Sequence, residues 1–421
     1  MYKKKMFYLL YLVLFMLMLM RTSTDTPNIL YRTAFLVTLL APLFFIDKKY
    51  FTPILICFMT IGTYGFAFNY LPYEISIYFY ITLLFLIFRR VKCDKSHISL
   101  FFVITVLFLL FRNILDSFHP QDVFYSCATV GVFSLISNED RNDSMKLMLY
   151  SFAVISIGLS LLYLINYEKF IEDYSAGEGL ERSGWMDPNY FSCVVGMGVM
   201  SSSILLMKPQ SKRRVFNLCF LIATIILSVI VQVLSASRGG ILAISLGVTI
   251  LLIFSKVRLG YKILVVFFIF CFVAWMYQNN YFELLEYRLN NDDGTGSGRL
   301  DIWTRKLDAM ASDGNILHWI IGYGYQSGFQ LTGSAGNGVG FHNDFIAIFC
   351  EYGLLGLLIF LCYLCKPLMI SAKENRPIVL ALLLYLWAVC MTLEPFSLGY
   401  LPYFAFYYLV ILVSKSEIKM E

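Results

Sequence analysis

Four arginines in this 421-residue chain stand in polar stretches between apolar runs, and their type suggests phosphate chemistry. They are Arg182, Arg238, Arg299 and Arg305. The guanidinium group is a planar fork of donors that binds two phosphate oxygens at once. Arg238 precedes Gly239 and Gly240 in a tight turn, where the missing side chains let a ligand approach the backbone. We therefore expect these arginines to bind an anionic group; the alternative for Arg238 is that it extends to lipid headgroups.

His342 is a candidate base beside these arginines, because it stands where a long polar stretch returns to an apolar run. Imidazole titrates near neutral pH and can take a proton from a hydroxyl group. Asn343, Asp344 and Glu351 follow it as supporting residues; the two carboxylates are weaker base candidates, and Glu351 is alternatively structural. The alternative for His342 is a polar residue that caps the following helix.

Patterns for disulfides, metals and nucleotides are incomplete. Most of the ten cysteines fall inside apolar runs, which is not the arrangement of a disulfide framework. The stretch 291–294 lacks the ligand spacing of a calcium loop. The glycine-rich stretch 336–340 lacks the Lys-Ser/Thr pair of a phosphate-binding loop and follows no strand. We therefore expect no metal and no cofactor.

The elements that must position these residues are membrane helices. Hydrophobic residues make up 59% of the chain and charged residues only 14%, with a mean hydropathy of +0.70. Soluble proteins carry about a quarter charged residues, so a soluble enzyme, a disordered regulator and a nucleic-acid binder are excluded. The net charge of +5 is too small to indicate a polyanionic partner.

Fourteen apolar runs approach the length of about 20 residues that a membrane-spanning helix needs. They cover residues 6–20, 29–46, 51–68, 73–88, 98–111, 122–136, 147–165, 190–207, 215–236, 240–254, 263–277, 341–365, 377–393 and 399–413. Since several are short, the predicted fold is an all-α, polytopic membrane bundle of about 12–14 transmembrane helices, with residues 1–421 forming a single transmembrane domain. The first run follows three lysines and lacks a cleavage site, so we expect a retained anchor.

The distribution of basic residues predicts the orientation. With the N-terminus in the cytoplasm and alternating spans, 23 of the 33 lysines and arginines lie on the cytoplasmic side. Cytoplasmic loops are typically enriched in these residues, so both termini are predicted to be cytoplasmic. The acidic loop 166–189 and the large loop 278–340 are then extracytoplasmic, and they carry three of the four candidate arginines. A long loop in a compact protein is usually functional.

The large loop contains a predicted amphipathic helix over residues 297–310. Its apolar stripe comprises Leu300, Trp303, Leu307 and Met310. Such a helix can lie in the membrane interface, with Trp303 as its anchor and with Arg299 and Arg305 near the level of a lipid-linked phosphate. The alternative is a plain interfacial helix whose charges are solvated.

Taken in chain order, these motifs resemble the O-antigen ligase/polymerase family of bacterial envelope glycosyltransferases. The resembling motifs are Arg182-x-Gly-x-x-Asp-Pro-Asn189, Ser237-Arg238-Gly-Gly240, Gly298-Arg299-x-x-x-Trp303, Gly322-x-Gly324, His342-Asn343 and Glu351-x-Gly353-x-x-Gly356. They cover roughly residues 180–360, whereas the first 170 residues resemble the family only as apolar spans.

The resemblance implies a metal-independent, inverting glycosyltransferase at the outer face of the bacterial cytoplasmic membrane. It would move a glycan from an undecaprenyl-diphosphate carrier to an acceptor hydroxyl. Arg238 and Arg299 would grip the diphosphate, and His342 would assist deprotonation of the acceptor. The implied partners are the lipid-linked oligosaccharide donor, a glycan acceptor, the lipid bilayer and a chain-length regulator, with no nucleic acid.

Two activities within this family, and one outside it, are left open. A polymerase joins lipid-linked repeat units, whereas a ligase moves finished polymer onto the lipid A core. We favour the polymerase because the large loop and the acidic loop together could accommodate two glycans. A lipid-linked oligosaccharide flippase is the alternative of a different class, but it should show charges within its spans. Here the middles of the apolar runs are nearly free of charge.

Overall fold

The computed structural model describes residues 107, 141–165, 167, 188–207, 215–255, 257–290, 298–324, 327, 340–396 and 401–416. Within these residues the regular secondary structure is entirely helical. The expected spans between residues 6 and 136 lie outside the described residues apart from Leu107, as do Arg182 and most of the acidic loop.

The eight described helices that match expected spans begin and end close to the predicted positions. They are α8 (Arg141–Ile165), α10 (Pro188–Met207), α11 (Val215–Leu234), α12 (Arg238–Phe254), α13 (Leu259–Gln278), α17 (Asp344–Ile370), α18 (Arg376–Thr392) and α19 (Leu401–Lys415). Among the described residues, α8, α10, α11, α13 and α17 are long and apolar enough to cross a membrane, and α12, α18 and most of α19 are shorter apolar helices. The predicted all-helical membrane fold is confirmed.

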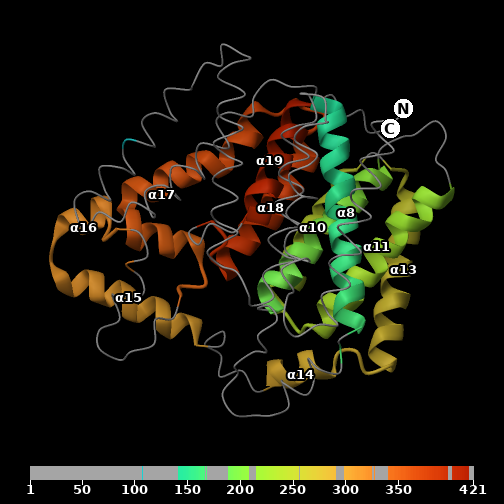
Figure 1. Ribbon diagram of the computed structural model, residues 1–421, viewed down its shortest axis with the longest axis horizontal. Coiled ribbons are helices and arrows are strands. Elements are labelled where there is room, and N and C mark those ends of the chain that lie inside the picture. The colour runs from blue at the N-terminus through green and yellow to red at the C-terminus, as the bar shows by residue number, and fades with distance from the viewer. Residues whose placement is uncertain are drawn as a thin grey trace, which may run out of the picture.

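The large loop adds three helices: α14 (Glu283–Asn290), α15 (Arg299–Asp313) and α16 (Ile316–Ile321). Helix α15 confirms the helix expected over residues 297–310. In Figure 1, α15 and α16 lie beside α17, on the opposite side of the molecule from α13.

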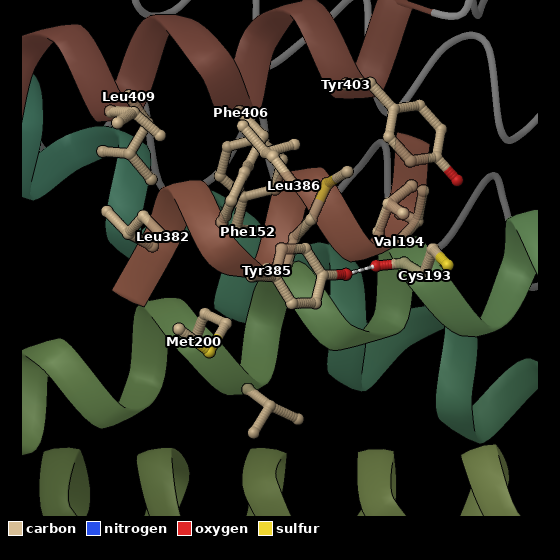
Figure 2. Close-up of a cluster of buried hydrophobic side chains, with 14 of the residues drawn as sticks. Phe152, Cys193, Val194, Met200, Leu382, Tyr385, Leu386, Tyr403, Phe406 and Leu409 are labelled. Atoms are coloured by element: carbon tan, nitrogen blue, oxygen red, sulfur yellow. Dashed lines mark hydrogen bonds between the residues drawn. The ribbon is translucent and has the colours of Figure 1, made fainter. Parts of the chain in front are cut away.

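Helix α10 lies at the centre of the described bundle, packed against α8, α11 and α12. Small residues allow this close packing: a side chain at Gly198 would overlap Ser156, whose hydroxyl donates to the Val195 carbonyl at 2.7 Å. In lipid, where apolar burial does not drive helices together, small residues and hydrogen bonds between helices supply the attraction. Figure 2 shows the same principle on another side, where the Tyr385 hydroxyl of α18 donates to the Cys193 carbonyl of α10.

Contacts between helix ends define two ends of the bundle. At one end Ser416, after α19, donates to the Met145 sulfur at 3.3 Å, and Asn375, before α18, donates to the Val413 carbonyl at 3.0 Å. At the other end the Glu394 amide, after α18, donates to the Tyr190 hydroxyl at 3.2 Å. Helix ends that are distant in the sequence therefore meet at each end of the bundle, and the predicted path of the chain would make the second end the outer one.

Helix α17 is bent at Gly353, where the backbone has φ 66° and ψ −168°. The loop segment after α16 pairs with the chain just before the bend: the Tyr323 amide donates to the Cys350 carbonyl at 2.9 Å, and the Gly324 amide donates to the Glu351 carbonyl at 2.8 Å. Figure 1 shows the two parts of α17 meeting at an angle beside α16. The span expected over residues 341–365 thus corresponds to a bent helix, α17, and the backbone carbonyls released at the bend are satisfied by a distant segment.

Replacing Gly353 with alanine should destabilise the protein. Only glycine readily adopts its backbone angles, and a Cβ there would overlap the Ile320 carbonyl carbon. The strained backbone alone costs about 1–3 kcal/mol. We expect a lower thermal unfolding midpoint in detergent, measured by fluorescence-detected size-exclusion chromatography. Gly260→Ala is the matched control, because a Cβ at Gly260 meets no atom within 4 Å. Equal midpoints for the two variants would contradict this account of the bend.

Candidate functional site

The turn between α11 and α12 presents Arg238 as the first residue of a helix. Ser237 caps α12 by accepting a hydrogen bond from the Gly240 amide at 3.3 Å, and its hydroxyl donates to the Asn189 side chain at 3.2 Å. A Cβ at Gly239 would lie 2.7 Å from the Thr392 hydroxyl oxygen, and one at Gly240 would overlap Ser192. Packing against α10 and α18 is thus one reason for these two glycines, and it holds Arg238 beside the end of α18.

The segment before α17 holds His342 in an unusual backbone conformation. Its φ is 50°, a left-handed value that few residues other than glycine adopt. The His342 amide donates to the Glu394 carboxylate, and a Cβ at Gly340 would lie 2.6 Å from the same carboxylate oxygen. Strained backbone of this kind persists only where surrounding contacts enforce it, and it motivates a hypothesis of function. His342 is half-buried.

The neighbours of His342 have structural contacts. Asn343 caps α17, since its side-chain oxygen accepts from the Phe345 and Ile346 amides at 2.9 and 3.2 Å. Helix capping, the alternative considered for His342, is therefore performed by Asn343. Asp344 is buried, and its carboxylate accepts from the Phe396 amide at 3.1–3.2 Å, joining the start of α17 to the segment after α18.

Glu351 is buried beside the bend in α17. Its backbone carbonyl accepts the Gly324 amide, and a Cβ at Gly322 would overlap that same carbonyl group. Its position supports the structural interpretation. The Gly322-x-Gly324 motif lets the loop backbone reach the bend.

Helix α15 is attached to this segment through Phe341. The Trp303 indole N–H donates to the Phe341 carbonyl at 2.6 Å, and the Lys306 ammonium lies 3.8 Å from the centre of the Phe341 ring. Lys306 and Met310 are fully buried, whereas Leu300 is half exposed. The expected apolar stripe is thus only partly buried, and Trp303 anchors α15 to the protein rather than to headgroups.

The two arginines of α15 differ in environment. Arg299 is the first residue of the helix, after Gly298 with φ 76°, and it is half-buried. Arg305 is exposed, and its Nε donates to the Asp301 carbonyl of the same helix at 3.1 Å. Arg299 therefore lies at the end of α15 that precedes the Trp303 contact, while Arg305 faces away from the packed side.

Glu394 and Lys306 also belong to the candidate site, although nothing in the sequence clearly indicated either. Glu394 is 2% exposed; burial raises its pKa to about 7, against the opposing effects of the His342 amide and the Lys306 charge. Burial lowers the pKa of Lys306, and the charges of Glu394 and Glu351 oppose that shift. The available signal was a carboxylate followed by proline directly after an apolar run, which by itself suggests only a loop.

A continuous set of contacts connects most of the candidate residues at one end of the bundle. Gly239 packs on Thr392, the next segment carries Glu394, and Glu394 accepts from the His342 amide. The adjacent Phe341 contacts α15, which begins with Arg299. Among the described residues no cluster of histidine, cysteine, aspartate or glutamate could hold a metal ion. Arg182 lies outside the described residues.

A family model described as O-antigen ligase matches residues 222–361. The match covers about a third of the chain, from α11 to the second part of α17, and it includes Arg238, Arg299 and His342. It confirms the resemblance to the O-antigen ligase/polymerase family and supports a ligase- or polymerase-type function. Glu394 lies outside the matched segment. No curated protein matches the chain.

Glu394→Gln should make stability less dependent on pH. The pKa of Glu394 rises from 4.5 to about 7 on folding, so between these values the folded protein retains a proton that the unfolded chain has released. The contribution of this group to stability is therefore present at low pH and is lost as pH rises through about 7. As the pH is raised from about 5 to 7, the thermal unfolding midpoint of the unaltered protein should fall more than that of the Glu394→Gln variant.

The exposed Glu374, before α18 at the opposite end of the bundle, supplies the control. Glu374→Gln should retain the pH dependence of the unaltered protein. If Glu394→Gln retains it as well, Glu394 does not titrate as described.

Proposed function

We propose that this protein transfers a glycan from an undecaprenyl-diphosphate carrier to a sugar hydroxyl at the outer face of the bacterial cytoplasmic membrane. The observation that carries the proposal is the joining of the Arg238 turn, the His342 segment and α15 through Glu394, Thr392 and Phe341. These contacts place a cationic helix start and a histidine at the same end of a membrane bundle. The family match over the same residues supports transfer chemistry.

Arg238 and Arg299 bind the diphosphate in this proposal. Breaking the bond between the sugar C1 atom and the diphosphate oxygen develops negative charge on the leaving group. Both arginines are half-buried, so water screens their charge less than at a free surface. Each removed donor of this kind costs on the order of 10²–10³ in rate. Arg305 and Arg182 are further candidates for the same anion.

His342 accepts the proton of the acceptor hydroxyl as that oxygen attacks C1. One bond forms at C1 while the bond to the diphosphate breaks on the opposite side, so the configuration at C1 inverts. The positive charge that stabilises the diphosphate comes from guanidinium groups, which makes the proposed reaction independent of metal. Glu394 acts indirectly, by holding the His342 backbone in its left-handed conformation.

A repeat-unit polymerase is the preferred activity, with an O-antigen ligase as the alternative. The large loop 278–340 and the acidic loop 166–189 supply room and polar groups for two glycans. A flippase is less well supported, because the charged residues Arg238, Arg299 and Glu394 lie at or beyond helix ends rather than in the middle of spans.

Arg238→Ala and Arg299→Ala should each reduce glycan transfer on the order of 10²–10³-fold and weaken retention of the lipid-linked donor. Lysine at either position should restore little transfer, because an ammonium lacks the planar fork.

His342→Ala should lower turnover on the order of 10²–10⁴-fold but leave donor binding intact. The measurements are donor binding by native mass spectrometry and product length by gel electrophoresis, with purified protein in liposomes.

Arg376→Ala is the control, because Arg376 is exposed and begins α18 at the opposite end of the bundle. Its binding and turnover should match those of the unaltered protein. If both Arg238→Ala and Arg299→Ala make product of unaltered length, the two arginines do not bind the diphosphate as proposed.

Deleting the gene should separate the two activities. Loss of a polymerase leaves a single repeat unit on the lipid A core, whereas loss of a ligase leaves long polymer on the carrier lipid. We expect the single repeat, seen as collapse of the glycan ladder on electrophoresis. Stranded polymer would identify the ligase, and an unchanged ladder would contradict both.

A further inference from the structure

Helix α16 is unusual because most of its apolar side chains face away from the protein. Ile316, Leu317, Trp319 and Ile320 are 72, 56, 38 and 46% exposed. We name these four residues the α16 apolar surface. Leaving this much apolar area in water is unfavourable by about 25 cal/mol per Å², so contiguous exposed apolar side chains usually mark a binding surface.

The histidine of α16 is held by the segments on either side of the helix. The His318 Nδ1 atom lies 2.5 Å from an Asp313 carboxylate oxygen, and the Tyr323 hydroxyl donates to that same oxygen at 2.9 Å. His318 and Tyr323 also pack ring against ring, with centroids 4.1 Å apart. Because these contacts hold His318 against the end of α15 and Tyr323, α16 cannot rotate about its own axis without breaking them.

The α16 apolar surface continues into the surface of a membrane helix. Trp319 packs edge to face on Phe349 of α17, and the α16 backbone touches Gly353 at the bend. Directly after the bend, exposed leucines follow in α17. They are Leu354, Leu355 and Leu358, which are 51, 42 and 50% exposed. Figure 1 shows α16 at this bend, at the edge of the molecule. Exposed leucines in a helix that is long and apolar enough to span a membrane are suited to contact with lipid, and the α16 apolar surface adjoins them.

Helix α15 presents a different surface. Its buried residues face Phe341, while Asp301, Thr304, Arg305 and Asp308 are exposed. That polar surface suits water or headgroups. The sequence predicted that the Trp303 side of α15 lies in the membrane interface. In the structure Trp303 contacts the protein, and α16 is the helix of this loop that exposes an apolar surface.

We propose that the α16 apolar surface is immersed in the acyl chains of the leaflet next to the candidate site. Trp319 then lies near the boundary between acyl chains and headgroups, where tryptophan is enriched. Insertion of α16 holds the attached α15, and Arg299 with it, at the level of the headgroups. This proposal does not depend on glycan transfer.

Photo-crosslinking in native membranes tests the occupant of this surface. Benzoylphenylalanine replaces Leu317, with Leu358 in α17 as the lipid-facing reference and Asp308 in α15 as the matched exposed control. We expect phospholipid adducts, detected by mass spectrometry, at positions 317 and 358 and at most a trace at 308. A crosslinked pair of chains, a crosslink to another protein or an absence of lipid adducts at 317 would overturn the proposal.

A second measurement uses the protein without an unnatural residue. In liposomes containing brominated phosphatidylcholine, tryptophan fluorescence is quenched by bromine atoms within the acyl region. Trp319→Phe should reduce the quenched fraction relative to the unaltered protein, because it removes an indole close to those atoms. An equal or larger quenched fraction in the variant would place Trp319 away from lipid and overturn the proposal.

Discussion

The hydrogen bond from the His342 amide to the Glu394 carboxylate joins the start of α17 to the segment after α18, and the candidate site is organised around it. A buried carboxyl group is costly unless it has hydrogen-bond partners or an opposite charge. Here Glu394 has the His342 amide as a donor and the Lys306 ammonium as a nearby positive charge. Because Lys306 belongs to α15, its charge lies near Glu394 only when α15 is packed on Phe341. The position of one carboxylate thus constrains three separate segments of the chain.

The bend in α17 depends on a second constraint, the need to satisfy backbone groups in an apolar environment. A helix interrupted at Gly353 leaves carbonyl groups without their usual partners, and the Tyr323 and Gly324 amides supply replacements at Cys350 and Glu351. Irregular backbone at membrane depth is tolerated only where protein or a water-filled cavity receives it. The bend therefore links the loop to the membrane helix, and it fixes where α16 emerges beside the bundle.

These two constraints together explain why the loop is ordered over α15 and α16 rather than being a simple connection. One end of the α15–α16 pair is attached through Trp303 and Lys306, and the other through Tyr323. A site for a lipid-linked substrate benefits from such attachment, because charged groups must be held near the headgroups without entering the acyl region. Small residues of α10 also help to hold the site. They let α8, α11 and α12 pack closely enough to support the Arg238 turn.

Local sequence alone determined the membrane class, the position of each described span and the likeness to the O-antigen ligase family. The run predicted at residues 190–207, for example, corresponds to α10 at Pro188–Met207, because the thickness of a bilayer demands a continuous apolar stretch. The tight turn at Arg238 and the return of the chain at His342 were equally visible. Only the tertiary structure decided that Asn343 caps α17, that Lys306 is buried, that α17 bends at Gly353 and that Glu394 meets His342. Glu394 and His342 are 52 residues apart, and their pairing depends on how α17 and α18 pack. Hydrophobic length is a property of a single segment, whereas partners for buried polar groups come from wherever the folded chain places them.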